Sequence, residues 1–547
     1  MIDLLIVGAG GAGLTAALAA KAEGASVLVI GKHYPTNSQT AMAQGGINAA
    51  LGNVGEDSIE AHITDTLKSS RGLCDEVMVR SMCEKAPEAI RWLESIGVPF
   101  SRTEESQIAQ RQLGGTRSKR ACYSQDYTGL KILHTLYDTC LKEGIEFLDE
   151  HYLLNLITQE QEESGEGSIV KGVTILEIAT GEVKQIDAKS VLLATGGYAS
   201  IYHGFTTNAL GSTGDGVSAV MRAGGYLSDI EFVQFHPTAL RGSSILISES
   251  ARGEGGYILN GKGERFVDEL LPRDVVARAI YEQITEGEEV FLDIRHLGEE
   301  KLMELLPQEV HLCKLHEGID PLTQLIPIKP VAHYSMGGID VDHLLEVRNI
   351  QGCFAVGECS NAKIHGANRL GGNSLLEIIV FGKIAGENAL DFARAAHAVP
   401  ADDRQLHRDQ HSIDTIYNST SEINFYQKRD LIGDIFYQNA GIVRNRDSLS
   451  SLLKTIHKIE KELPLMGVGD KNRAHNTNLV EFIEFTNALE LSEALLVGAI
   501  SRDESRGAHY REDFPEQNDA EYGVHTIYKK EDGVLSVEFE KYYKKPI

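Results

Sequence analysis

The sequence predicts an α/β fold: a Rossmann-like nucleotide-binding domain, an insert of different pattern, a helical domain and a short C-terminal segment. Three observations predict it. A strand–helix–strand unit with clustered glycines opens the chain. The pattern of strands and glycine turns breaks off near residue 236 and resumes near 336, and amphipathic helical patterns fill most of 396–510. A chain of 547 residues exceeds one hydrophobic core, so several domains are expected.

The opening unit, "DLLIVGAGGAGLTAALAAKAEGASVLVIGK", predicts a βαβ motif. Gly8, Gly10 and Gly13 have GxGxxG spacing between an apolar strand and an Ala/Leu-rich helix. Glycines permit the tight turn and let a pyrophosphate approach the amide groups at the positive end of the helix. Gly31 and Lys32 follow the second strand, where NAD-binding domains usually carry an acidic residue. This departure argues against NAD and leaves FAD open.

The middle of the chain continues with helices, strands and a second glycine turn. Residues 57–97 and 127–144 have helical periodicity, and residues 168–197 alternate like a β-meander before ending in a buried strand. A helix is expected to begin near Asp215, whose carboxylate could cap the helix or contact a cofactor. The last thirty residues are polar and alternate like strands.

Glycine-rich turns recur at 8–13, 195–197 and 357–358, in each case at the end of an expected strand. One extended ligand that collects contacts from both halves of the chain explains this distribution better than loop glycines do. FAD fits that requirement better than NAD. The sequence therefore predicts an FAD-binding domain built from two separated parts.

Charge and cysteine content exclude several classes of partner. The net charge of -27 argues against nucleic acid or an anionic membrane surface, so an anionic substrate needs a local basic pocket. No apolar run approaches the roughly 18 residues of a membrane helix, and the N-terminus lacks a secretory pattern. The seven cysteines are scattered without a CxxC pair, which indicates a reducing compartment and no iron–sulfur or other metal site. The expected location is the cytoplasm.

Six motifs resemble the flavoprotein subunit of succinate dehydrogenases and fumarate reductases. They are "FVQFHPTAL", "SESARGEGGYILNGKGERF", "PRDVVARAI", "HYSMGGI", "GCFAVGECSNAKIHGANRLGGNSLLEIIVFG" and "DESRGAHYRED". The resemblance runs in order from residue 1 to about 515. It implies bound FAD, an α+β capping domain over a dicarboxylate site, and a helical domain behind them. The expected boundaries are an FAD-binding domain at 1–235 and 336–395, a capping domain at 236–335, a helical domain at 396–510 and a C-terminal segment at 511–547.

The resemblance assigns the dicarboxylate to His236, His333 and Arg369, with Ser248 adding a hydroxyl and Gly45 lying close by. Two carboxylates need several donors, and arginine binds a carboxylate in bidentate fashion. Either histidine alone would more often be structural. Their joint occurrence inside matching motifs favours the substrate role.

The same resemblance makes Arg273 the proton donor to substrate, supplied through Glu249 and Arg252. Arginine is a poor acid because its ordinary pKa lies above about 12, so it works only beside an anion that returns the proton. A simple ion pair between Glu249 and Arg252, three residues apart on one helix face, is the structural alternative.

The resemblance places a larger set of residues around the FAD, with Glu358 at the ribityl or ribose region and Ser374 and Leu375 near the isoalloxazine. The expected cofactor contacts are Gly8, Gly10, Gly11, Gly13, Lys32, Ser38, Thr40, Gln44, Gly45, Gly46, Thr195, Gly196, Gly197, Asp215, Glu358, Arg369, Ser374 and Leu375.

One loop departs from the family pattern. Much of the family carries a histidine in "SHTxxAQGG" that bonds covalently to the flavin, and the ungapped match to "SQTAMAQGG" puts Gln39 there. An amide nitrogen has no basic lone pair, so Gln39 cannot form the link and the FAD is expected to bind without a covalent bond. His33, six residues earlier, is a remote substitute. Without the electron-withdrawing imidazole the flavin should be the stronger reductant, which favours fumarate reduction.

The resemblance also implies a separate iron–sulfur subunit and a further membrane-anchor or electron-donor subunit. The chain itself is expected to lie peripherally at the inner face of the cell membrane, without inserting into it. The expected reaction is the interconversion of fumarate and succinate by hydride transfer at flavin N5. The alternatives are an L-aspartate oxidase, a succinate dehydrogenase working oxidatively, and a non-catalytic FAD-binding scaffold.

Overall fold

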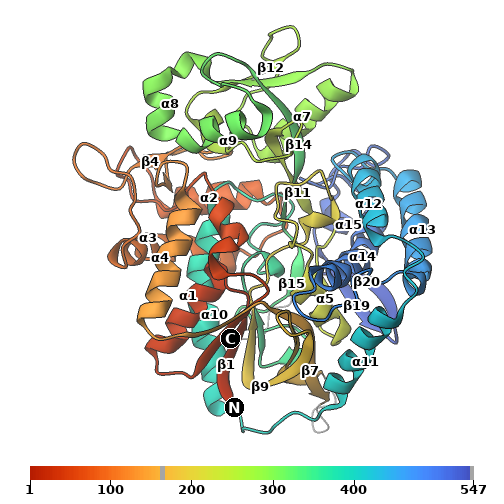
Figure 1. Ribbon diagram of the computed structural model, residues 1–547. Helices are drawn as coiled ribbons and strands as arrows, with labels where there is room; N and C mark the ends of the chain where they lie inside the picture. The colour runs from red at the N-terminus through yellow and green to blue at the C-terminus, as the bar shows by residue number, and fades with distance from the viewer. Residues whose placement is uncertain (161–166, 542–547) are drawn as a thin grey trace.

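A parallel sheet forms the centre of the molecule in the computed structural model, which describes residues 1–160 and 167–541 (Figure 1). Strand β1 (Ile2–Val7) pairs in parallel with β2 (Val27–Gly31) on one side and β9 (Glu182–Leu193) on the other. Beyond them, β6 (Glu146–Asp149) pairs with β2, and β17 (Cys353–Ala355) pairs with β9, again in parallel. The α/β class predicted from the opening unit is confirmed. Ligands of such sheets bind outside the carboxyl ends of the strands.

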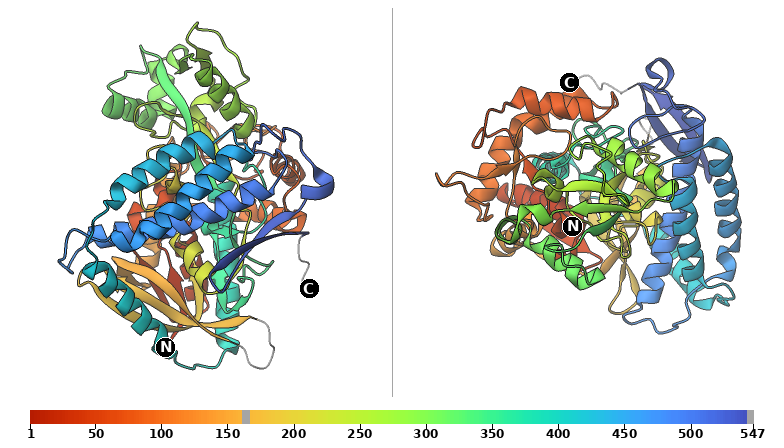
Figure 2. Two further views of the ribbon diagram at one scale, coloured as in Figure 1. Left: turned by 90° about the vertical axis from the view of Figure 1, so that its right-hand side faces the viewer. Right: turned by 90° about the horizontal axis from the view of Figure 1, so that it is seen from above.

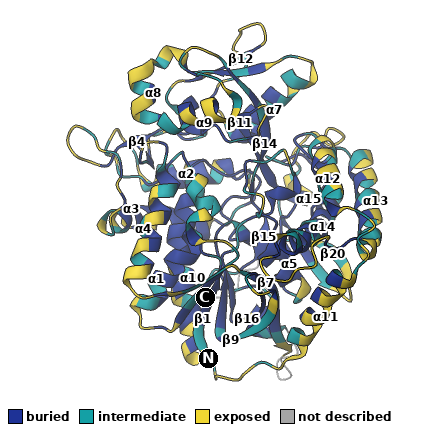
Figure 3. Ribbon diagram, in the orientation of Figure 1, coloured by how far each residue is buried: buried dark blue, intermediate teal, exposed yellow. Residues whose placement is uncertain are grey.

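Two helices cover one face of this sheet. Helix α1 (Gly11–Ala22) packs along α10 (Asn373–Ala395), although more than 350 residues separate them in sequence. The approach is close enough that a Cβ at Gly386 would lie 2.4 Å from the carbonyl oxygen of Ala16. The facing surfaces of both helices and the strands beneath are buried (Figure 3). The N- and C-terminal parts of the FAD-binding domain therefore share one core.

The predicted β-meander is confirmed as the antiparallel strands β7 (His151–Glu160), β8 (Ser168–Glu177) and β9. Helix α11 (Arg404–Asn418) lies against this meander (Figure 1). Its Asp409 carboxylate accepts a hydrogen bond from Asn155 Nδ2 at 2.8 Å. The first helix of the region predicted as the helical domain thus contacts the FAD-binding domain directly.

A second sheet rises above the first and corresponds to the predicted insert (Figure 1). Its strand order is β11 (Val233–Leu240), β14 (Ile326–Ser335), β13 (Val290–Asp293) and β12 (Tyr257–Asn260). Around it lie α7 (Arg273–Thr285), α8 (Glu299–Leu305) and α9 (Pro307–Glu317). These elements have a separate hydrophobic core, which includes Leu240, Val276 and Ile328. The expected boundary at 236 lies inside β11, and the one at 335 is the last residue of β14.

The C-terminal third is helical and ends in a hairpin. Helices α12 (Phe425–Asn439), α13 (Arg446–Glu462) and α14 (Thr477–Ser501) lie beside one another (Figure 2). The expected strand character of the last residues is confirmed by β19 (His525–Glu531) and β20 (Val534–Glu540). This hairpin joins a five-stranded sheet in the order β18 (Ser360–Asn361), β15 (Gly338–Asp340), β10 (Leu227–Ser228), β19, β20.

Most of the remaining helices and strands lie before residue 260. They are α2 (Ile59–Ser69), α3 (Glu76–Ser95), α4 (Thr128–Lys142), α5 (Asp215–Arg222), α6 (Glu249–Gly253), α15 (Asp519–Tyr522) of the C-terminal segment, and the short strands β3 (Ile47–Asn48), β4 (Gln110–Arg111), β5 (Ala121–Cys122) and β16 (Ile350–Gln351). Helices α2, α3, α4 and α5 confirm the predicted helical segments. Among the described residues, no helix combines the length and apolar character needed to cross a membrane.

Candidate active site

A long cavity runs from the carboxyl ends of the parallel strands to the underside of the second sheet. It encloses about 1700 Å³ of empty space, including its open mouth. Most of the residues expected to bind cofactor or substrate line it. These are Gly8, Gly10, Gly11, Lys32, Ser38, Thr40, Gln44, Gly45, Gly46, Thr195, Gly196, Asp215, His236, Ser248, Glu249, Arg273, His333, Glu358, Arg369, Ser374 and Leu375.

Three expected residues do not form the cavity wall. A Cβ at Gly13 would lie 2.0 Å from the carbonyl oxygen of Gly8, so this glycine serves helix-to-strand packing. A Cβ at Gly197 would lie 2.4 Å from Glu358 Oε1, behind the wall. Arg252 is fully buried and reaches the site only through Glu249. For Gly13 and Gly197 the spacing in sequence identifies the neighbourhood and misses the depth, whereas Arg252 lies behind Glu249, where the expected relay needs it.

One end of the cavity lies at the start of α1, where the sequence predicts the pyrophosphate site. Gly8 has φ +114°, and a Cβ there would meet the Ala194 carbonyl oxygen at 2.2 Å, so only glycine permits this turn. Gly10 is the N-cap and offers no side-chain acceptor to the helix amides, while Gly11 N donates to Thr40 Oγ1 at 3.1 Å. Free amides at the positive end of a helix suit a phosphate group.

Lys32 occupies the position at which NAD-binding domains usually carry an acidic residue. Its ammonium group forms ion pairs with two carboxylates of the protein. Nζ lies 2.6 Å from Asp215 Oδ2 and 2.6 Å from Glu484 Oε1 of α14. Burial opposes the charge, but the two carboxylates together hold the pKa of Lys32 above its ordinary value. Lys32 therefore ties β2 to α5 and α14 beside the cavity. Glu484 was not anticipated, because nothing local in its helix distinguishes it.

Buried polar atoms along the cavity support the assignment of FAD. Ser38 Oγ, Gln44 Oε1, Thr195 Oγ1 and Arg369 Nε are buried without a hydrogen-bond partner among the described residues. All four side chains line the cavity. Buried polar groups are rarely left unpaired, so this set is matched to a ligand with many acceptors and donors along its length. The residues present fit FAD.

Gln39 lies in the wall as well. Its Oε1 accepts a hydrogen bond from Ala209 N at 2.9 Å, which holds the amide against the loop before α5. His33 also lines the cavity, with its Nε2 near Gly211. Burial, followed by the charge of Lys32, lowers the pKa of His33.

Glu358 lines the cavity, partly buried, next to the strand end that the sequence assigns to the flavin. Its Oε1 accepts hydrogen bonds from Ser335 N at 3.0 Å and Ser335 Oγ at 3.1 Å. Burial raises the pKa of Glu358 to about 7, against these two hydrogen bonds. The group therefore changes its charge near neutral pH, at a position that can accept or donate a hydrogen bond to a hydroxyl of the ligand.

At the other end of the cavity Arg273, the first residue of α7, contacts Glu249, the first residue of α6. Arg273 Nη2 and Nε donate to Glu249 Oε2 at 2.6 and 3.0 Å. Gly114 N donates to the other oxygen at 2.8 Å, and Arg252 Nη2 lies 3.7 Å from that oxygen. The expected trio Arg273–Glu249–Arg252 is thus a continuous buried row.

Charges in this row oppose the effect of burial. Burial alone would favour the neutral acid, but Arg273 and then Arg252 hold the pKa of Glu249 below its ordinary value. Burial also lowers the pKa of Arg252, partly offset by Glu249. Burial therefore brings the Arg252 guanidinium closer to releasing a proton than an exposed one, and the adjacent Glu249 carboxylate is the group that could take that proton.

His236, His333 and Arg369 converge on the same end of the cavity. The two imidazole rings are 4.9 Å apart, and His333 Nδ1 lies 2.7 Å from Thr207 Oγ1. Burial and then Arg273 hold the pKa of each histidine well below its ordinary value, so both rings are neutral near pH 7. They can donate hydrogen bonds to a carboxylate without carrying charge.

Arg369 supplies the second positive charge. Its guanidinium carbon lies 4.1 Å from the centre of the Tyr334 ring, a cation–π arrangement. Burial, with the charge of Arg273 adding, lowers the pKa of Arg369 to about 10, so it remains protonated at pH 7. Two arginines and two neutral imidazoles around one cavity form the local basic pocket that the net negative charge of the chain requires.

Ser248 lines the cavity, and Gln234 lies behind Arg273, outside the residues that line it. Ser248 caps α6, its Oγ accepting a hydrogen bond from Ser250 N at 3.1 Å. Gln234 was not singled out from the sequence, although it stands in the quoted motif two residues before His236. Its Oε1 accepts from Arg273 Nη1 at 3.1 Å, and its Nε2 donates to the Arg369 carbonyl oxygen at 2.9 Å. One amide thus holds both arginines.

A separate group of possible metal ligands lies on α13 and α14. His457 Nε2 is 2.9 Å from Glu493 Oε1, with Glu460 beside them. None of the three lines the cavity. The histidine and glutamate form an ordinary ion pair, and Lys530 lies close enough to disfavour a further cation.

Comparisons with known proteins agree with this arrangement. Residues 3–375 match the family described as an FAD binding domain, and residues 429–547 match the fumarate reductase flavoprotein C-terminal family. The chain is 40% identical to the 8-methylmenaquinol:fumarate reductase flavoprotein subunit of Wolinella succinogenes, over 96% of this chain and 88% of that protein. It is 39% identical to the succinate dehydrogenase flavoprotein subunit of Rickettsia bellii, over 96% and 92%.

A solved quinol fumarate reductase of E. coli superposes with a TM-score of 0.91 at 35% identity, over 99% of this chain and 96% of that one. The match extends through the FAD-binding part, the second sheet and the helical region. The chain therefore belongs to the family of succinate dehydrogenase and fumarate reductase flavoprotein subunits, and it is an oxidoreductase that binds FAD.

Proposed function

We propose that this chain interconverts fumarate and succinate and works mainly as a fumarate reductase. The observation that supports this most strongly is the convergence of Arg273, Arg369, His236 and His333 on one end of the FAD cavity. A dicarboxylate needs a positive or donor group for each end, and this set supplies both. Bound FAD would supply a hydride from N5.

In this proposal the substrate is held by Arg369 and the two imidazoles, and Arg273 gives the proton. Arg273 faces the cavity and touches the carboxylate of Glu249, so a proton lost to substrate is replaced along Arg252, Glu249 and Arg273. The enclosed position excludes water, which strengthens every charge interaction in the site. Arg273 orients the bound carboxylate until transfer occurs.

We propose further that the FAD is bound without a covalent link. Gln39 occupies the loop position of the linking histidine, and its amide is engaged with Ala209. The flavin then lacks an electron-withdrawing imidazole, which favours the reductive direction. Oxidation of succinate as the physiological direction is the alternative that a potential measurement would support.

Partner subunits belong to the proposal as well. The names of the relatives include quinols as donors, and this chain has no cysteine motif for an iron–sulfur cluster. We infer a separate iron–sulfur subunit and a further donor or membrane-anchor subunit, with this chain at the cytoplasmic face. Tyr34 and Met42, which line the cavity, are 52% and 40% exposed and offer apolar surface suited to a docking protein.

The test is a choice between substrates. The FAD-loaded protein is reduced with light in the absence of oxygen and mixed with fumarate, and the oxidised flavin spectrum should return with formation of succinate. Separately, the oxidised protein is mixed with L-aspartate, which should leave the flavin oxidised. Bleaching by aspartate would establish an L-aspartate oxidase instead. A flavin that responds to neither compound would establish a binding scaffold.

A further inference from the structure

The residue after Arg273 is bound by an arginine from the FAD-binding part. Arg71 Nη2 donates to Asp274 Oδ1 at 3.0 Å and to Oδ2 at 2.8 Å. Asp274 is the second residue of α7, and its side chain is only 2% exposed. Arg71 lies in the turn after α2 with its side chain 27% exposed, so this partly buried ion pair joins the body of the molecule to the first turn of the helix that carries Arg273.

The backbone of Arg71 is strained. Its φ is +57°, in the left-handed region that favours glycine, and Gly72 follows with φ +80°. A non-glycine residue persists in such a conformation only when its surroundings impose it, and strain of this kind concentrates at functional sites. Arg506 supplies the constraint, because its Nη1 donates to the Arg71 carbonyl oxygen at 2.6 Å. The side chain of Arg71 is therefore kept at a position where glycine would be easier.

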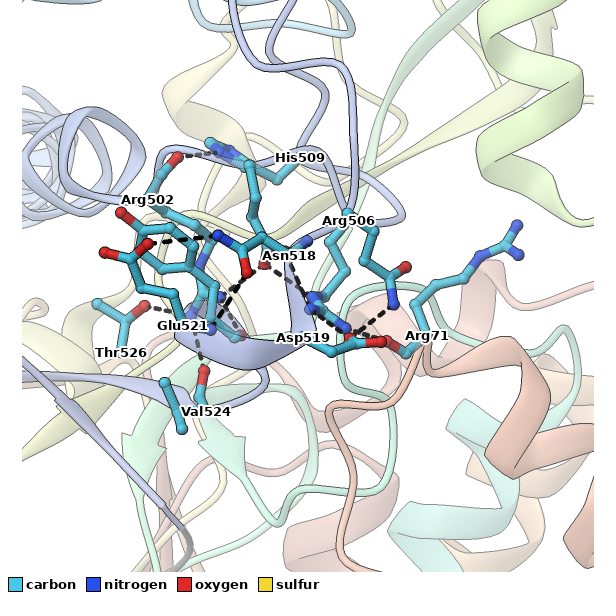
Figure 4. Close-up of polar contacts among 12 residues, drawn as sticks. Arg71, Arg502, Arg506, His509, Asn518, Asp519, Glu521, Val524 and Thr526 are labelled. Atoms are coloured by element: carbon cyan, nitrogen blue, oxygen red, sulfur yellow. Dashed lines mark hydrogen bonds and ion pairs between the residues drawn. The ribbon is translucent and has the colours of Figure 1, made fainter.

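Arg506 is itself fixed from the C-terminal segment (Figure 4). Its side chain is fully buried, and its Nε and Nη2 donate to the two oxygens of Glu504 at 2.7 and 2.9 Å. Arg506 Nη2 also donates to Asp519 Oδ1 at 2.8 Å, and Arg502 Nη1 donates to Glu504 Oε1 at 3.0 Å. A row of buried charges thus runs from α14 to the turn that holds Arg71.

The same loop touches α7 a second time. Arg278 Nη1 donates to the Gly507 carbonyl oxygen at 3.3 Å, and its guanidinium carbon lies 4.9 Å from the centre of the Tyr510 ring. Arg71 and the loop at 506–510 therefore hold both the first and the second turn of α7. Movement of this helix relative to the FAD-binding part would break both contacts and displace Arg273.

We propose that Arg71 is a positioning residue for proton transfer: by holding Asp274 it fixes the N-terminus of α7, so that Arg273 meets Glu249 and the substrate in one geometry. This inference rests on the proposed function of Arg273. Arg71 acts through Asp274 and does not line the cavity. Arg502, Glu504 and Arg506 set the position of Arg71. They thereby couple the loop that follows α14 to the active site.

The decisive variant is Arg71→Gly, because it removes the guanidinium and relieves the strained φ at once. We expect the FAD content to equal that of wild type. The melting temperature should fall by no more than a few degrees, because Arg278 Nη2 still lies 4.0 Å from Asp274 Oδ2 and the strained φ is relieved, while kcat for fumarate falls about tenfold to hundredfold. KM should change less than threefold, because the substrate-binding side chains are untouched. Arg71→Lys should be intermediate, and added methylguanidinium should restore part of the rate of Arg71→Gly. Arg80→Ala, which removes an exposed ion-paired arginine on α3, is the matched control and should behave as wild type.

Hydrogen exchange gives a second readout that needs no turnover. Amides of residues 273–280 should exchange faster in FAD-loaded Arg71→Gly than in wild type, with the other helices unchanged. A kcat within twofold of wild type, or unchanged exchange in α7, would overturn the inference. Wild type is measured in parallel, and a wild type that fails to reduce fumarate would refute the proposed function, leaving the exchange result to decide whether Arg71 holds α7.

Discussion

At the residue scale, proton transfer depends on Glu249, which accepts two hydrogen bonds from Arg273. Glu249→Gln keeps the shape of the side chain but removes the charge that returns a proton. We expect kcat for fumarate to fall by about 10²–10⁴ while FAD content stays the same. The measurement compares the steady-state rate of Glu249→Gln with that of Glu289→Gln. Glu289 is an exposed residue of the insert and serves as the control. A rate for Glu249→Gln within twofold of wild type would remove Glu249 from the relay.

Gln39 permits a second test at this scale. Acid precipitation of the wild type should release the flavin into the supernatant, because an amide cannot bond to it. Gln39→His should retain part of the flavin in the pellet and raise its reduction potential, and Gln39→Asn, the matched amide, should do neither. Flavin in the wild-type pellet would contradict the non-covalent proposal and direct attention to His33.

Sequence and structure differ most clearly at single residues. Motif spacing predicted most of the cavity wall, because glycines and strand ends fix where backbone meets ligand. It missed Gln234 and Glu484 and did not show that Gly13 and Gly197 lie behind the cavity wall. Burial depth and partners across hundreds of residues depend on tertiary packing, and no local pattern encodes them.

At the element scale, Asp126 joins the FAD-binding part to the start of α9. Its Oδ2 accepts from Gln308 N at 2.8 Å and Glu309 N at 3.0 Å. Burial, stronger than these hydrogen bonds, raises the pKa of Asp126 to about 6. The folded protein therefore binds this proton more tightly than the unfolded chain, and the stability it contributes is complete below about pH 4 and is lost as the pH rises through about 6.

Asp126→Asn cannot ionise and should escape that loss. The free energy of unfolding of the variant, relative to that of wild type, should therefore rise by up to about 3 kcal/mol between pH 4 and pH 8. Urea unfolding of the FAD-loaded proteins at both pH values measures it, with Asp434→Asn on exposed α12 as the control. An equal difference between variant and wild type at both pH values would show that Asp126 does not titrate in this range.

The elements themselves were largely predictable where periodicity is local. The opening βαβ unit, the meander and the helix at Asp215 were all expected. Within the insert, Asn260 N donates to Glu264 O at 3.0 Å in a tight turn, whereas β12 pairs with β13, thirty residues further on. Long-range pairing of this kind leaves no local signal.

At the scale of the whole molecule, Glu504 connects the C-terminal segment to the rest. It is fully buried and accepts hydrogen bonds from Arg502, Arg506 and Asn518 N. Glu504→Gln would leave buried guanidinium groups without their carboxylate, which typically costs about 3–5 kcal/mol. Urea unfolding of this variant beside Glu512→Gln should show that loss. A loss below about 1 kcal/mol would mean that the contacts of Glu504 with Arg502 and Arg506 do not hold the C-terminal segment in place.

The central claim is that Arg273 delivers the proton to a dicarboxylate held over the flavin. The most direct measurement is a single turnover: FAD-loaded wild type and Arg273→Ala are photoreduced without oxygen, mixed with fumarate, and followed by the return of the oxidised flavin spectrum. The account predicts rapid reoxidation of wild type and a rate at least about 10²-fold lower in Arg273→Ala. Equal rates in the two proteins would contradict it.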